Sequence, residues 1–237
     1  MLKYRQALRA ASVLMRQPFE FVALNAMTDA VSLSWPVQWW YRRLIKDVPQ
    51  RTLDYLRELT RRPIDFDALE RMPESTLGHQ YIKFMKESGI PINGHVKAVP
   101  ALRETFEKDW VTQRFFKIHD ILHVVAGFDA TVQGEMGLQM FDARNLREPY
   151  GIASVASTPY MMLIYGGPAR MLREIARGWE VGSRGDNLFF APFEEMWGWD
   201  LADVRVACGL APRRRWGAAR AAAIAASSRD AAAHPNG

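Results

Sequence analysis

The chain has 237 residues, of which 49% are hydrophobic and 24% charged, so it can enclose one sizeable core and is neither disordered nor fibrous. Its single cysteine, Cys208, excludes an intramolecular disulfide and a cysteine-based zinc module, so any bound metal must be held by histidines and carboxylates. The net charge of +5 is concentrated near the two ends of the chain, which indicates either an anionic surface such as a membrane or, equally, a pair of solvated basic tails. No basic and aromatic alternation follows in the middle, so nucleic acid is not an expected partner.

The N-terminal region predicts a helix over residues 1–30, because its apolar residues recur near the helical period. The stretch is rich in arginine and poor in acids, as in a mitochondrial transit peptide, but its pattern favours a mature helix. Pro36 interrupts it. Trp39 and Trp40, followed by two arginines, then form an amphipathic cluster of the kind found at membrane interfaces. The alternative is an aromatic helix that packs on the core.

The next segment predicts short helices separated by clear stop signals. They are expected over 53–59, from the cap at Asp65 to Arg71, and from Ser75 or Thr76 to Ser88, with a loop over 89–100. A longer helix is expected from Pro100 to Gly127, where the glycine suits a helix C-terminus. Asp129 is the predicted N-cap of a second helix that runs to about Asn145. A tight turn between the two would make them an antiparallel hairpin.

Residues 149–169 contain no charged side chain and almost match the length of a membrane span. Several prolines and glycines argue against a simple spanning helix. We expect a buried helix whose Met161, Met162 and Ile164 line an apolar cavity, or else an ordinary core helix. Residues 186–205 are rich in aromatic residues and end in an amphipathic helix, and a basic Ala/Arg-rich tail, 213–237, is expected to be flexible. The predicted fold is all-α, with one helical domain over 1–212.

The residues most suggestive of chemistry lie in the predicted hairpin. His119 and His123 are four residues apart, so a helix presents both imidazoles on one face, as a metal ion requires. Asp120 lies at the edge of that face, where it could bind the metal or orient a histidine. Glu135 follows the turn by about six residues, or about 9 Å of helix, which places its carboxylate level with the two rings. The alternative is a polar hairpin in which Asp120 pairs with a nearby arginine such as Arg114.

Imidazole and carboxylate donors suit zinc, and two histidines with one carboxylate also suit ferrous iron. A phosphoester hydrolase of the His-Asp type would need a further histidine and aspartate, for which His95 and Asp142 are poor candidates. His79 and His234 have no assigned role. The sequence contains no Gly-rich phosphate loop and no serine or cysteine nucleophile motif.

The string His119-Asp120-x-x-His123, followed by eleven residues and then Glu135, resembles the signature of the coenzyme Q biosynthesis protein 4 family. Two further segments resemble the family's sequence, one starting at Pro73-Glu74-Ser75 and one at Glu194-Glu195-Met196-Trp197. Together the similar segments cover roughly residues 73–210. The first 70 residues and the basic tail lie outside the resemblance.

The resemblance implies an all-helical protein that binds zinc, or a similar ion such as iron, through His119, Asp120, His123 and Glu135. It implies a role in ubiquinone synthesis, namely the oxidative decarboxylation of a polyprenylated hydroxybenzoate at ring carbon one. The polyprenyl tail of that substrate would bind to an apolar surface formed by Trp39, Trp40, Met161, Met162 and Ile164. The alternative function is a non-enzymatic scaffold that binds prenyl lipid and organises the other biosynthetic enzymes around a structural metal. A homodimer is left open. The expected location is the inner face of a bacterial membrane, or else the matrix face of the mitochondrial inner membrane.

Overall fold

The computed structural model describes residues 34–89 and 109–210, together with residues 5, 8–10, 12, 13 and 32. Within those residues the protein is helical and contains no strand, which confirms the all-α prediction. The helices are α3 (Trp35–Ile45), α4 (Gln50–Arg61), α5 (Phe66–Glu70), α6 (Leu77–Glu87), α9 (Trp110–Ala126), α10 (Val132–Phe141), α11 (Pro149–Ala156), α12 (Thr158–Tyr165), α13 (Pro168–Gly182) and α14 (Leu201–Ala207). A π-helical turn, η1 (Asp142–Leu146), and two 3-10 turns, η2 (Leu188–Phe190) and η3 (Phe193–Glu195), complete the described elements.

Several predicted helix starts are confirmed by their caps. The Asp65 side chain accepts a hydrogen bond from the amide of Ala68, and the hydroxyl of Thr76 accepts one from His79. Most of the helix expected over 1–30 lies outside the described residues, although the positions described there before residue 14 are helical. The loop expected over 89–100 and the tail 213–237 also lie outside them, except for Gly89.

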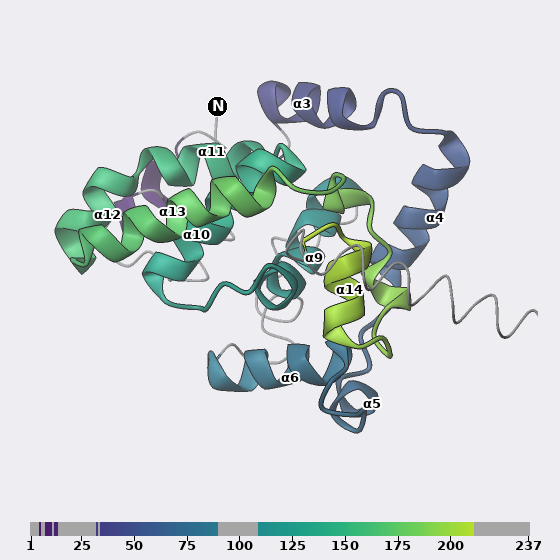
Figure 1. Cartoon of the computed structure of the whole chain (residues 1–237). Helices are drawn as coiled ribbons and strands as arrows, with labels where there is room; N and C mark the ends of the chain where they lie inside the picture. The colour runs from purple at the N-terminus through teal and green to yellow at the C-terminus, as the bar shows by residue number, and fades with distance from the viewer. Residues whose placement is uncertain are drawn as a thin grey trace, which may run out of the picture.

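Helix α9 lies in the middle of the molecule in Figure 1 and supplies many residues of the core. It also carries the predicted histidines. It does not run continuously from Pro100 as expected, because Asp109 is a non-helical N-cap whose side chain accepts from the amides of Val111 and Thr112. This cap sets the start of the helix at Trp110. The side chains of Ile118, Ile121 and Leu122 are fully buried. Helices α4, α6 and α14 contact α9, and they surround it in Figure 1.

A buried group of charges ties α9 to the C-terminal segment. The guanidinium of Arg114 bonds to the carboxylate of Glu194, at side-chain exposures of 0% and 3%. Lys117 lies 3.3 Å from the same carboxylate oxygen and also donates to three carbonyl groups at the end of α4. Arg114 therefore pairs with Glu194 rather than with Asp120, the partner considered in the polar-hairpin alternative.

Helix α10 packs most extensively against α13, and the two lie side by side in Figure 1. Glycines allow this close approach, since a Cβ atom at Gly178 would lie 2.1 Å from the carbonyl oxygen of Gly137. Helices α9 and α10 pack against each other much less extensively than α10 and α13 do.

The uncharged stretch 149–169 is not the buried helix that we expected. It forms α11 and α12, which meet at Ser157 and bury only Gly151 and Thr158. Leu163 is 81% exposed and Ile164 is 50% exposed, while Met161 and Met162 are half-buried. Each of the two helices has a proline in its first turn. Pro149 begins α11, and Pro159 separates α11 from α12 because a proline fits the first turn of a helix but interrupts its interior. Periodicity alone cannot tell a buried apolar run from an exposed one.

The two tryptophans of α3 have different surroundings. Trp39 is 45% exposed, whereas Trp40 is partly buried against the core and its indole N–H donates to the carbonyl of Arg147. For Trp40 the packed-helix alternative is thus confirmed. In the described part of the chain, no helix combines the length and the hydrophobicity that crossing a membrane requires.

Candidate metal centre

The turn between α9 and α10 brings their side chains together. Gly127 ends α9 in the left-handed conformation, with φ of 77°, as predicted for a C-cap. The N-cap of α10 is Thr131 and not Asp129, because the Thr131 hydroxyl accepts from the amide of Gly134. Asp129 instead accepts from the amide of Thr131 and so shapes the turn itself.

Three of the four predicted ligands form one cluster. The Nε2 atom of His123 lies 3.0 Å from Oε2 of Glu135, and the Nε2 atom of His119 lies 3.3 Å from Oε1 of the same carboxylate. One ligand atom from each residue lies within 4.8 Å of the other two. Two imidazoles and a carboxylate are a donor set that zinc and ferrous iron accept, so the residues fit a divalent metal.

Each imidazole is held through its other nitrogen, Nδ1. That atom of His119 lies 3.2 Å from Oδ2 of Asp142, and that of His123 lies 3.2 Å from the carbonyl oxygen of Phe128. Acceptors at these positions favour the tautomer with the proton on Nδ1, in which the Nε2 atoms that face Glu135 have a lone pair available for a metal ion. The ring of Phe84 also stacks on His123, with centroids 4.9 Å apart.

The charges of the cluster are strongly coupled. Burial alone would lower the pKa of His119, but the charge of Glu135 and hydrogen bonds to Asp142 and Glu135 raise that pKa well above 6.5. Burial alone would raise the pKa of Glu135, but the charge and hydrogen bonds of His119, with those of His123, lower it well below 4.5. Without a metal, a protonated His119 therefore pairs with an ionised Glu135.

Asp120, the fourth predicted ligand, is not part of this cluster. It is a buried residue of α9, and its charge adds to the burial that raises the pKa of Tyr81, on α6. Asp142, considered above only for a hydrolase, lies next to His119, while His95 lies outside the described residues.

The sequence pattern did not assign Gln139, Asp142 and Glu148 to the metal site, although helical spacing could have identified the first two. Glu135, Gln139 and Asp142 are spaced at i, i+4 and i+7, which places them on one face of α10 and its extension. The third, Glu148, follows the π-helical turn and caps α11 by accepting from the amide of Gly151 at 2.6 Å. Burial raises the pKa of the Glu148 carboxyl to about 8, and the nearby Asp142 adds to this rise.

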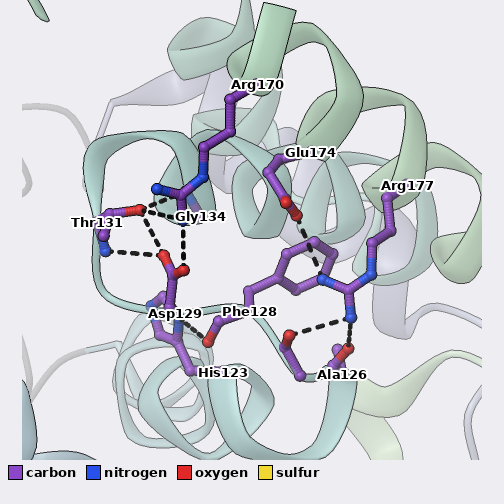
Figure 2. A network of polar contacts seen from close by, with 10 residues as sticks. His123, Ala126, Phe128, Asp129, Thr131, Gly134, Arg170, Glu174 and Arg177 are labelled. Carbon is purple, nitrogen blue, oxygen red and sulfur yellow. Dashed lines mark hydrogen bonds and ion pairs between the residues drawn. The ribbon is translucent and has the colours of Figure 1, made fainter. Parts of the chain in front are cut away.

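Helix α13 fastens the turn that carries the site, as Figure 2 shows. Arg177 donates to the carbonyl oxygens of Ala126 and Gly127 at 2.9 and 3.0 Å, and Arg170 pairs with Asp129 at 2.6 Å. Arg205, on α14, donates to the preceding two carbonyls of α9. Arg177 and Arg205 together satisfy carbonyl groups that the end of α9 would otherwise leave unpaired.

A cavity of about 220 Å³ lies elsewhere, where residues 62–72 meet the C-terminal segment. Its walls include Ile64, Leu69, Met72 and Trp197. None of the candidate metal ligands lines it, so we do not assign it to the site.

Comparison with known proteins points to the same family as the histidine motif does. The family model described as "Coenzyme Q (ubiquinone) biosynthesis protein Coq4" matches residues 5–213. A ubiquinone biosynthesis protein COQ4 homolog of Plasmodium vivax is 27% identical over 145 residues, which cover 60% of this chain and 40% of that protein. A COQ4 homolog of Xenopus tropicalis is 26% identical over 202 residues, which cover 80% and 65%. This chain thus spans 40% and 65% of the lengths of these two relatives.

A solved structure supports the fold. The crystal structure of a putative ubiquinone biosynthesis protein from Nostoc punctiforme superposes with a TM-score of 0.69 at 24% identity, covering 88% of this chain and 99% of that one. The family match extends over most of the chain and includes the helices, the turn and the histidine–glutamate cluster described above. The chain belongs to the Coenzyme Q (ubiquinone) biosynthesis protein Coq4 family.

Proposed function

We propose that this chain acts in ubiquinone biosynthesis as a metal-dependent carbon–carbon lyase, which removes the carboxylate from ring carbon one of a polyprenylated hydroxybenzoate. The observation that carries the proposal is the cluster of His119, His123 and Glu135. His119 and Glu135 have side-chain exposures of 27% and 23%, so one side of the cluster is open to a ligand. Three protein donors with an open position are typical of catalytic metal sites.

A divalent metal, with zinc favoured over iron, would supply a Lewis acid for a substrate oxygen. The protein's own residues would prepare that site. Asp142 and the carbonyl of Phe128 orient the two imidazoles, and the stacked ring of Phe84 limits the rotation of His123. In the proposed reaction the bond from ring carbon one to the carboxylate breaks and carbon dioxide leaves. The hydroxyl group that replaces the carboxylate requires an oxidant from outside the chain.

The polyprenyl tail of such a substrate requires contact with lipid. The exposed Leu163 and Ile164 on α12, with Met161 and Met162 beside them and Trp39 on α3, support peripheral binding to a membrane surface. Relatives of this chain are named mitochondrial proteins, which supports the matrix face of the inner membrane as its location, with the inner face of a bacterial membrane as the alternative.

The second candidate function is a scaffold that binds prenyl lipid and gathers the other ubiquinone-biosynthesis enzymes, with the metal in a structural role. The exposed apolar residues of α11 and α12 favour it, since Ile152, Leu163 and Ile164 are each at least 50% exposed. Such a scaffold would require a closed metal shell, with Asp120 as a fourth ligand.

Replacing His123 with alanine separates the two functions. We expect cells that carry only His123→Ala to lose ubiquinone, while the purified variant remains helical by circular dichroism and still floats with lipid vesicles. The matched control is His79→Ala, because His79 lies on α6 outside the cluster. If His123→Ala instead unfolds or leaves the vesicles, the metal is structural and the scaffold is favoured.

A further inference from the structure

Gln139 is the residue that distinguishes the two oxygens of Glu135. It lies one helical turn after Glu135 on α10, and its amide Nε2 donates to Oε1 of Glu135 at 2.8 Å. That same oxygen faces His119, whereas Oε2 faces His123 at 3.0 Å. Among the residues that the structure describes, one carboxylate oxygen therefore has an amide donor beside it and the other does not.

The backbone of Gln139 is fixed from the side of α11. A Cβ atom at Gly151 would lie 2.5 Å from the carbonyl oxygen of Gln139, so α11 packs directly on this turn of α10. Two residues earlier, Gly137 is packed against the ring of Phe128 and the backbone of α13. The position from which the amide reaches Glu135 is thus held on two sides, and little ordering is needed when a ligand binds.

We propose that Gln139 is a positioning residue. Its amide keeps Oε1 of Glu135 hydrogen-bonded, so that only Oε2 of this carboxylate is available to bind a metal ion. A carboxylate that binds through both oxygens occupies two coordination positions, and one that binds through a single oxygen leaves a position for an oxygen atom of the substrate. This inference rests on the proposed function, specifically on metal binding by the cluster. It assigns Gln139 to the shell around the ligands and not to contact with the metal.

The test uses the full-length protein loaded with Co²⁺, whose visible absorption reports the coordination number of the ion. Gln139→Leu removes the amide donor at similar side-chain size. We expect Co²⁺ to bind about 10- to 100-fold more weakly, the range typical for the loss of such a partner. We also expect a weaker visible absorption, because the released Oε1 raises the coordination number. Gln133→Leu, on the same helix but with its amide next to Gly167, is the matched control.

The outcomes separate this inference from the proposed function. The inference holds if Gln133→Leu has the same Co²⁺ spectrum as the wild type, while Gln139→Leu binds Co²⁺ more weakly and has a different spectrum. If Gln139→Leu binds with unchanged affinity and spectrum, the inference is wrong and the metal site stands. A lower melting temperature with an unchanged spectrum would show a merely structural glutamine, which also overturns it. If the wild type binds no Co²⁺, the metal site and the inference both fail.

Discussion

Replacing Glu194 with glutamine is expected to lower the free energy of unfolding by about 3–5 kcal/mol. The carboxylate of Glu194 is the ion-pair partner of Arg114, whose side chain is 0% exposed, and it also lies 3.3 Å from Lys117. A neutral amide would leave two cations in the protein interior without a counter-charge, although carbonyl groups would still accept their hydrogen bonds. Urea denaturation followed by circular dichroism measures the change.

The neighbouring residue gives a matched control. Glu195 is exposed, so Glu195→Gln is expected to change the free energy of unfolding by less than about 1 kcal/mol. An apolar double variant, Arg114→Met with Glu194→Met, should recover part of the lost stability because only one cation, Lys117, then lacks its counter-charge. Equal effects of the two glutamine substitutions would contradict the importance of the buried pair.

Metal affinity is expected to rise by about tenfold for each pH unit below the pKa of His119. In the metal-free protein the charge of Glu135 and the hydrogen bonds to Asp142 and Glu135 hold that pKa well above 6.5 despite burial, so His119 keeps its proton above the pH at which a free imidazole loses it. A metal ion binds the neutral imidazole, and binding must release this proton. Affinity therefore rises as the proton concentration falls, and levels off only above the pKa of His119.

Calorimetry in buffers of different ionisation enthalpy measures the number of protons released on metal binding. We expect about one proton from the wild type. His119→Gln, which has no proton to release at this position, is expected to show a weaker affinity and a flatter dependence on pH. A wild-type affinity that does not change with pH would contradict the His119–Glu135 pair described here.

Local spacing was enough to predict the centre of the site. His119 and His123 share a helix face, and Gly127 ends that helix where predicted, so the short connection to α10 brings Glu135 to both rings. Helical period and turn chemistry are local properties, which one sequence reveals.

Beyond the helical spacing of Gln139 and Asp142, the surroundings of the site depend on packing that no local pattern encodes. The π-helical turn after α10 keeps Asp142 beside His119 and leads to Glu148, and Arg147 adopts a left-handed φ of 58° at its end. The partner of Arg114 is 80 residues away in sequence. The exposure of α12 also depends on which helices cover it, and an apolar run does not specify that.

The central claim is that His119, His123 and Glu135 hold a metal ion, and elemental analysis of the purified protein beside Glu135→Ala tests it most directly. The account predicts one divalent ion per chain in the wild type and its loss in the variant, with the helical content unchanged. No metal in either protein after supplementation with zinc and ferrous iron would contradict it, and the three residues would then be a polar cluster at a helix turn.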